Sequence, residues 1–239
     1  MRALLHTIVV RLLIFFVLLL SLVPFSLIAL IPKKYRFKSK TAFWIVHLFY
    51  RMILRLLFLP ITIHNKQYLP DEPAIFVANH QSTLDIPLLG VLCGGKPHIW
   101  LARADLLESL FLRIIIPIFA IVVDLTSTAQ ASGAARQILR LANDTDAHIL
   151  LFPEGARHTD GKVHDFLNGY VLFAKRTGRP LVPVAILGVN LIYPPGQFML
   201  YPAPIHVVIG KPFVFGAEES DEAFKQRVYN WFTQQMRNE

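Results

Sequence analysis

Cysteine is almost absent from this 239-residue chain, in which Cys93 is the single thiol. One thiol excludes an intramolecular disulfide, a redox pair and a metal cluster held by several cysteines. Charged residues are also scarce, at 17% of the chain against about 25% in ordinary soluble domains. Hydrophobic residues make up 54% of the chain, so part of this apolar excess is expected to face lipid.

Acidic residues are outnumbered, with 16 Asp and Glu against 24 Lys and Arg, which gives a formal net charge of +8. Such a charge favours an anionic partner, whether nucleic acid, a phosphorylated substrate or acidic lipid headgroups. The sequence contains no nucleic-acid-binding motif, and its aromatic residues lie inside apolar runs rather than among the basic residues. We therefore expect the membrane bilayer, and no nucleic acid, as a partner.

No charged residue interrupts the run from Leu12 to Ile31. As a helix, its twenty residues are long enough to cross a hydrocarbon layer of about 30 Å. A cleaved signal peptide fits less well, because its apolar region covers about 7 to 15 residues and precedes a small-residue cleavage site. Pro24 lies within the run and can kink the helix or turn it back, so spanning and re-entrant forms both stay open.

A basic cluster follows the apolar run and is expected to lie against anionic headgroups on the cytoplasmic side of the membrane. Its members are Lys33, Lys34, Arg36, Lys38 and Lys40. A second helix is predicted over 42–59, in or along the interface, because its polar residues recur every four positions on one face. We interpret residues 1–59 as two N-terminal membrane-anchoring helices and residues 60–239 as a single α/β domain, large enough for an enzyme.

Beyond Pro60, short β-rich runs alternate with helical patterns. This order predicts an α/β domain with a mixed, mostly parallel sheet flanked by helices. The predicted strands are Ile61–His64, Ala74–Ala78, Phe119–Val123, His148–Phe152, Leu181–Leu187 and Ile205–Ile209. The predicted helices are Ile86–Leu92, Ser132–Ala142, Asn168–Arg176 and Asp221–Arg237.

Polar loops follow two of these strands, and ligands of such sheets gather where strands end. The first loop, after Ala74–Ala78, contains His80 and, five residues later, Asp85. Histidine is suited to act as a general base, and a carboxylate on its other nitrogen fixes the tautomer and stabilises the imidazolium. Backbone N–H groups at the start of the helix after His80 are expected to stabilise an oxyanion. A structural histidine capped by a local aspartate is the alternative.

The second loop, after His148–Phe152, contains Glu154, Gly155 and Arg157. A guanidinium offers a fork of donors for a phosphate or carboxylate, and glycine lets the backbone approach a ligand closely. We expect Glu154 to orient Arg157 or the acceptor, whereas an ordinary surface ion pair is the alternative. His158 and His164 lie nearby with Asp160 and Asp165, but this polar loop is expected to hold no metal.

Together, three motifs resemble those of the glycerolipid acyltransferase family typified by 1-acylglycerol-3-phosphate acyltransferase, over about residues 60 to 210. The first motif, Asn-His followed by four residues and Asp, matches Asn79, His80 and Asp85. The third motif, Phe-Pro-Glu-Gly with a following Arg, matches Phe152, Pro153, Glu154, Gly155 and Arg157. The fourth motif matches Val182, Pro183 and Val184.

The resemblance implies a membrane enzyme with its active site facing the cytoplasm. It would transfer a fatty acyl group from acyl-CoA or acyl carrier protein to the hydroxyl of a lysophospholipid, foremost 1-acylglycerol-3-phosphate, giving phosphatidate. No cofactor or metal is implied beyond the acyl thioester co-substrate. His80 and Asp85 would be catalytic; the implied substrate-binding residues are Glu154, Gly155, Arg157, Arg103 and Asn79.

This chain departs from the family pattern near the acceptor. Leu125 stands where an Arg of the second motif is usual, and the segment 166–169 lacks the family's Lys-x-Gly. Another lyso-lipid acceptor therefore stays open, as does a non-catalytic lipid-binding role. A lipase or thioesterase is a further rival, but the chain has no G-x-S-x-G elbow, and Ser82 is the nearby serine.

Overall fold

The computed structural model describes residues 2–108, 110–124, 126–193 and 197–237. The described helices are α1 (Arg2–Leu30), α2 (Lys33–Arg36), α3 (Lys40–Arg55), α4 (Asp85–Val91), α5 (Leu110–Phe119), α6 (Thr128–Asp144), α7 (Gly169–Thr177), α8 (Val189–Ile192) and α9 (Asp221–Arg237). Two short 3-10 helices, η1 (Lys66–Tyr68) and η2 (Ala104–Glu108), lie in the connections. The strands are β1 (Ile61–His64), β2 (Ile75–Ala78), β3 (His98–Arg103), β4 (Ala120–Val123), β5 (His148–Leu151), β6 (Leu181–Leu187) and β7 (Ile205–Ile209).

The strands form one seven-stranded sheet in the order β1-β7-β6-β2-β5-β3-β4. Every pair is parallel except β6 with β7, so the predicted mixed, mostly parallel sheet is confirmed. Strand β3 and helix α5 were not predicted from the sequence. The strand predicted from Phe119 begins one residue later, because α5 ends at Phe119 and β4 begins at Ala120.

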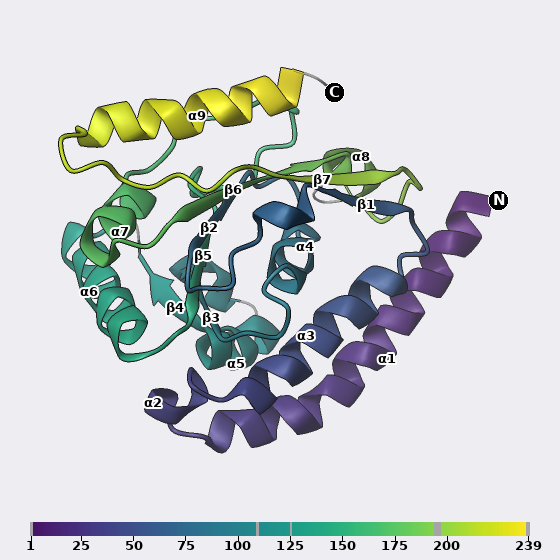
Figure 1. The fold of residues 1–239 in the computed structure, drawn as a ribbon. Coiled ribbons are helices and arrows are strands. Elements are labelled where there is room, and N and C mark those ends of the chain that lie inside the picture. The colour runs from purple at the N-terminus through teal and green to yellow at the C-terminus, as the bar shows by residue number, and fades with distance from the viewer. Residues whose placement is uncertain (1, 109, 125, 194–196, 238–239) are drawn as a thin grey trace.

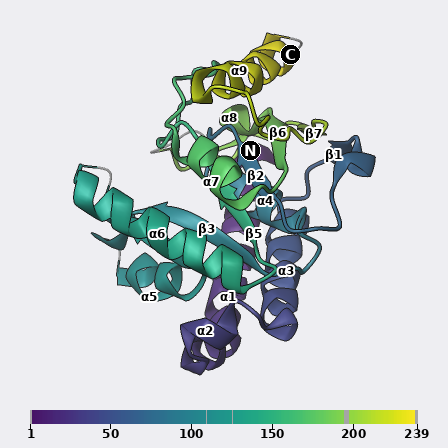
Figure 2. The same ribbon diagram turned by 60° about the vertical axis from the view of Figure 1, so that its left-hand side comes forward.

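Helices cover both faces of the sheet (Figures 1 and 2). Alternate side chains of β2 point to opposite faces, as the strand period of two requires. Ile75 and Val77 pack in the core that includes residues of α6, α7 and α9. Phe76 and Ala78 pack in a second core, with α4 and the C-terminal end of α3. Both faces of β2 are therefore dry, which explains its uninterrupted apolar sequence.

The N-terminal helices α1 and α3 lie side by side along one flank of the sheet (Figure 1). Near its start, α1 is fixed by polar contacts: Thr7 Oγ1 accepts from Leu200 N at 3.0 Å, and Arg11 Nη2 donates to Phe198 O at 2.8 Å. Beyond these contacts, one face of α1 is apolar and exposed, as in Leu20 and Val23. By length and composition α1 can cross a membrane, as predicted for this region.

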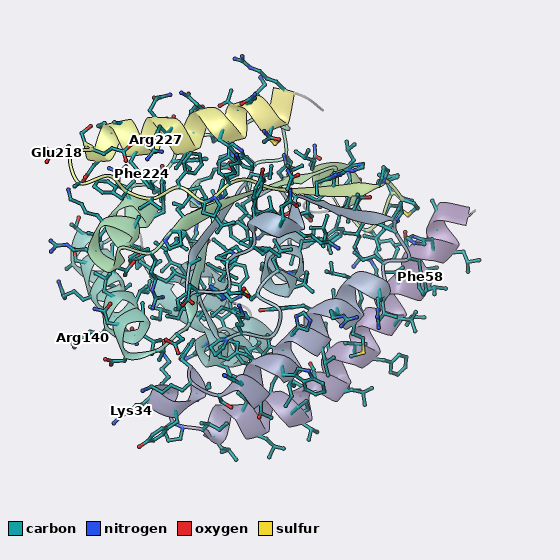
Figure 3. All side chains as sticks on the ribbon, in the orientation of Figure 1. Lys34, Phe58, Arg140, Glu218, Phe224 and Arg227 are labelled. Atoms are coloured by element: carbon teal, nitrogen blue, oxygen red, sulfur yellow. The ribbon has the colours of Figure 1, made fainter. Side chains whose placement is uncertain are left out.

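The prediction that Arg36 lies against lipid headgroups with the other basic residues is wrong. Its side chain is buried, and its guanidinium donates to Ala29 O at 2.7 Å, Ile31 O at 2.8 Å and Ile118 O at 3.0 Å. Unsatisfied carbonyls at a helix C-terminus attract cations, so Arg36 caps α1 and joins it to α5 instead of meeting headgroups. Lys34 does extend outward, from α2 at the edge of the molecule (Figure 3).

The N-terminal helices share their hydrophobic core with the α/β part of the chain. Phe25 of α1 lies edge-on to Phe119 with a centroid distance of 5.2 Å, and Phe43 of α3 packs against His98 of β3 at 4.7 Å. The division of the chain at residue 60 stays a prediction. The packing shows that α3 contacts β3, the strand that ends at the candidate site.

Candidate active site

The candidate site lies where three neighbouring parallel strands end. β2, β5 and β3 are adjacent in the sheet and run in the same direction, so the segments after Ala78, Leu151 and Arg103 meet at one edge. This is the edge at which open α/β sheets bind ligands. The two loops singled out in the sequence are therefore neighbours.

His80 and Asp85 form the predicted pair, because His80 Nδ1 lies 2.8 Å from Asp85 Oδ2. Asp85 is the first residue of α4 and is fully buried, whereas the His80 side chain keeps 15% of its surface exposed. A carboxylate can only accept, so His80 carries its proton on Nδ1, and its Nε2 is left as the basic nitrogen. This is the tautomer that a general base requires.

Backbone donors hold the carboxylate of this pair. Gln81 N and Ser82 N both donate to Asp85 Oδ2, at 2.6 and 2.7 Å. The role predicted for the N–H groups at the helix start after His80, stabilisation of an oxyanion, stays a prediction; Gln81 N and Ser82 N lie before that helix. They fix Asp85, and through it the imidazole, because each already has a charged acceptor.

Asn79 is buried and holds the loop to the neighbouring strand. Its Nδ2 donates to Ile186 O at 2.8 Å, and its Oδ1 accepts from Ile186 N at 2.7 Å. Asn79 was predicted to bind substrate. In the structure its amide is engaged by β6 on both sides, which suits a residue that positions His80.

The loop after β5 is joined to the loop that carries His80. His158 N donates to His80 O at 2.8 Å, and Glu154 Oε1 accepts from His80 N at 3.3 Å. Arg157 is exposed, and its Nη1 donates to Thr83 Oγ1 at 3.0 Å. The structure thus brings the predicted guanidinium to the rim of the candidate site, close to the His80–Asp85 pair.

Glu154 is a buried carboxyl group whose Oε2 has no hydrogen-bond partner among the residues that the structure describes. Burial raises its pKa to about 8, and the negative charges of Asp85 and Asp160 add to this effect, while the N–H donors of His80 and His164 oppose it. Near neutral pH the side chain is therefore mostly protonated. Among the described residues no hydrogen bond or ion pair joins Glu154 to Arg157, so Glu154 does not hold that guanidinium directly.

Arg103 ends β3 and reaches the loop after β5. Its Nη1 donates to Gly155 O at 3.0 Å, while Nε and Nη2 hold Asp105 in a two-point ion pair at 3.1 and 2.9 Å. Gly155 adopts a φ of +67°, which a residue with a Cβ rarely does. Arg103 therefore contacts the loop that carries Arg157, and Asp105 offsets part of its positive charge. The substrate-binding role of Arg103, Gly155 and Arg157 stays a prediction.

Phe152 supports the His80 ring, a role that the motif did not indicate. Its ring stacks on the His80 imidazole, with a centroid distance of 3.9 Å and an interplanar angle of 7°. The other neighbour of Phe152 is Trp100, at 5.6 Å and 28°. Trp100 was not predicted, because it belongs to the strand that the sequence analysis missed.

His158 and His164 stack at 3.6 Å, and His164 Nε2 lies 3.0 Å from Asp160 Oδ2. No group of three or more metal-ligating side chains occurs in the part of the chain that the structure describes. Leu125, where the family pattern has Arg, lies outside the described residues. Leu167 is exposed, and Asn168 precedes α7 without a side-chain cap.

Comparison with known proteins decides the family. Residues 60–187, over half of the chain, match the family described as acyltransferase. The chain belongs to the acyltransferase family. The matched range contains both loops of the site. It begins one residue before β1 and ends with β6.

Two relatives of the chain carry the name 1-acyl-sn-glycerol-3-phosphate acyltransferase. The protein of Limnanthes alba is 27% identical over 168 residues, which cover 67% of this chain and 57% of that protein. The protein of Chlamydomonas reinhardtii is 31% identical over 183 residues, which cover 72% of this chain and 52% of that protein. The chain thus spans little more than half the length of these relatives.

A solved structure shares the fold over nearly the whole chain. The 1-acyl-sn-glycerophosphate acyltransferase of Thermotoga maritima matches with a TM-score of 0.79 at 22% identity. The match covers 99% of this chain and 95% of the other. The N-terminal helices are therefore part of the shared fold of these two chains, together with the α/β sheet.

Proposed function

We propose that this chain transfers a fatty acyl group from acyl-CoA or acyl carrier protein to the hydroxyl of a lysophospholipid at a membrane surface. The preferred acceptor is 1-acylglycerol-3-phosphate, and the product is then phosphatidate. The observation that carries the proposal is the His80–Asp85 pair at 2.8 Å, joined by His158 N to the loop that bears Arg157. Relatives named 1-acyl-sn-glycerol-3-phosphate acyltransferase support it.

In the proposed reaction, His80 Nε2 removes the proton of the acceptor hydroxyl as that oxygen attacks the thioester carbonyl. Asp85 Oδ2, 2.8 Å from Nδ1, stabilises the imidazolium that forms. The tetrahedral intermediate collapses, the C–S bond breaks, and the imidazolium returns its proton to the thiolate. A thiol has a pKa near 8.5, so the leaving group departs readily and no acyl-enzyme is needed.

The acceptor headgroup would be held by the cations on the rim. One N–H of the Arg157 guanidinium donates to Thr83, and its other N–H groups can pair with phosphate oxygens. Arg103 adds a second guanidinium, fixed to Gly155 O. Glu154, protonated near neutral pH, would donate its hydroxyl proton to an ester or phosphate oxygen instead of repelling it.

The bilayer is the proposed surface on which this reaction occurs. Besides the apolar face of α1, the neighbouring helix α3 exposes Trp44, Leu48 and Met52. Burial of such a face in acyl chains would keep a lipid acceptor within reach of the site. The basic residues that remain exposed after α1, including Lys33 and Lys34, would lie at cytoplasmic headgroups.

The decisive experiment incubates the purified full chain, in vesicles, with labelled acyl-CoA and a panel of lyso-lipids. We expect phosphatidate from 1-acylglycerol-3-phosphate and a loss of about 10³-fold or more in kcat for His80→Ala. His206→Ala is the matched control, because His206 is an exposed histidine on β7. Activity of His80→Ala within about tenfold of wild type would rule out the proposed base.

The same assay separates the rival functions. Release of free fatty acid without an acceptor, together with an acyl adduct on Ser82, would favour a lipase or thioesterase. Lipid binding without turnover for any acceptor or donor would favour a non-catalytic role. Transfer to another lyso-lipid in preference to 1-acylglycerol-3-phosphate would keep the reaction and change its substrate.

A further inference from the structure

The His80 imidazole rests on a stack of rings that leads to helix α3. Phe152 lies flat on His80 at 3.9 Å, and Trp100 lies behind Phe152 at 5.6 Å. Trp100 Nε1 donates to Tyr50 Oη at 3.1 Å. Tyr50 belongs to α3, so an N-terminal helix ends a chain of contacts that begins at the proposed base.

At its polar end, the stack joins a buried chain of hydrogen bonds in which the donor and acceptor of each bond can be identified. His98 Nδ1 lies 3.0 Å from Lys96 O, a carbonyl that only accepts, so Nδ1 carries a proton. Burial lowers the pKa of His98 to about 4, so the ring is neutral near pH 7 and its Nε2 is an acceptor. The Tyr50 hydroxyl, 3.4 Å from this nitrogen, therefore accepts from Trp100 and donates to His98.

Tyr50 also contacts the helix that carries Asp85. Its ring lies so close to Gly90 of α4 that a Cβ at that position would overlap the ring carbons. Asp85 is the first residue of the same helix. One side chain of α3 thus supports both partners of the pair, His80 through the ring stack and Asp85 through α4.

We infer that Tyr50 is a positioning residue for the His80–Asp85 pair, which it holds in place from α3 through Trp100, Phe152 and α4. The inference rests on the proposed function in assigning His80 as the base. Tyr50 touches no substrate in this arrangement. Its hydroxyl fixes the angle of the Trp100 indole, the indole backs Phe152, and Phe152 is the surface on which the imidazole lies.

The test compares Tyr50→Phe with Tyr170→Phe in the full chain in vesicles. Both tyrosines are buried, but the Tyr170 hydroxyl has no hydrogen-bond partner among the described residues, so its loss breaks no contact. We expect Tyr50→Phe to lower kcat about tenfold and to leave KM for the acceptor within about twofold, because misplacement of the base affects the chemical step. Tyr170→Phe should match wild type.

A second variant removes the same hydrogen bond from its other side. Trp100→Phe keeps an aromatic ring behind Phe152 but has no N–H to donate to Tyr50. If both residues act through this one contact, the double variant should be no slower than the slower single variant. Multiplied losses would overturn the inference. Should Tyr50→Phe fail to fold, Trp100→Phe alone decides, and a kcat equal to that of Tyr170→Phe would overturn it.

A readout without turnover separates this inference from the proposed function. Diethyl pyrocarbonate modifies the free imidazole nitrogen, and peptide mass spectrometry gives the rate at His80 alone. A loosened stack exposes the ring, so we expect this rate to rise about threefold in Tyr50→Phe and not in Tyr170→Phe. Equal rates in the two variants would overturn the inference. A wild-type chain without acyl transfer would instead refute the proposed function and leave this comparison valid.

Discussion

At the scale of the residue, Asp85 illustrates how one oxygen atom organises a loop. Oδ2 accepts from His80 Nδ1, Gln81 N and Ser82 N, all within 2.8 Å. Three donors on one carboxylate oxygen fix three consecutive residues, His80 to Ser82, relative to the start of α4, so the imidazole is already oriented in the free chain. The five-residue spacing of the motif follows from this turn.

Glu154 gives the first prediction at this scale. Because burial raises its pKa to about 8, the folded chain binds more protons than the unfolded chain between about pH 4.5 and 8. The contribution of Glu154 to the free energy of unfolding is therefore complete below about pH 4.5 and is lost as the pH rises through about 8. Glu154→Gln cannot ionise and escapes this loss.

The measurement is thermal unfolding of wild type and Glu154→Gln in the same detergent. The Tm of the variant minus that of wild type should grow steadily from about pH 5 to about pH 8.5 and stay constant below about pH 4.5. Glu72→Gln is the control, because Glu72 is exposed. A difference independent of pH would contradict the burial of the Glu154 carboxyl group.

Individual site residues were predictable to the extent that short motifs specify them. His80 and Asp85 are close in sequence, so their contact could be inferred from a single turn. Phe152 and Trp100 were beyond such reasoning, because aromatic stacking between β5 and β3 depends on which strands are neighbours in the sheet. Arg36 was misplaced for the same reason: its acceptor Ile118 lies 82 residues away.

At the scale of the element, apolar periodicity indicated six of the strands and missed β3. The sequence of β3, HIWLAR, begins and ends with polar residues, whose places in the fold become clear only from tertiary contacts. His98 is buried with a hydrogen bond at each ring nitrogen, and Arg103 emerges at the rim of the site. α5 was missed because its apolar run was attributed in part to the following strand.

Gly90 of α4 gives a prediction at this scale. Gly90→Ala should lower the free energy of unfolding by about 1 to 3 kcal/mol, because the added Cβ overlaps the buried Tyr50 ring and α3 must move away from α4. Chemical denaturation in detergent measures the effect. The loss outweighs the gain in helix propensity, which is about 0.5 to 1 kcal/mol.

The matched control is Gly133→Ala in α6, where the added Cβ approaches no atom closer than 4.0 Å. This variant should be stabilised by about 0.5 to 1 kcal/mol, because alanine is the better helix former. The two substitutions are chemically identical, so opposite signs isolate the contact with Tyr50. Stabilisation by both would show that α3 and α4 are packed less tightly than the structure indicates.

At the scale of the whole molecule, the exposed apolar face of α1 gives a prediction about attachment. Leu20 and Val23 are 71% and 68% exposed and lie one helical turn apart. Leu20→Glu with Val23→Glu should reduce binding to anionic vesicles by about tenfold or more, since each places a charge in the hydrocarbon. Flotation of the chain with vesicles measures the bound fraction.

Val214→Glu is the control for that experiment. Val214 is 61% exposed, and its carbonyl accepts from Arg227 of α9 at 3.1 Å. Helix α9 lies on the side of the molecule away from α1 and α3 (Figure 1). Binding of this variant to vesicles should equal that of wild type. If all three glutamates weakened binding alike, the helix pair would not be the attachment surface.

The two anchor points of α1 have a consequence for where chemistry takes place. Thr7 and Arg11 tie one end to the segment after β6, and Arg36 ties the other to α5. Because α1 is held at both ends, it cannot tilt independently of the α/β part of the chain. In the proposed reaction, the depth at which α1 lies in the bilayer would therefore set the height of His80 Nε2 above the acyl chains. An insertion of one turn in α1 would therefore place His80 and the hydroxyl of the proposed lipid acceptor at different heights relative to the bilayer, although no residue of the site had changed.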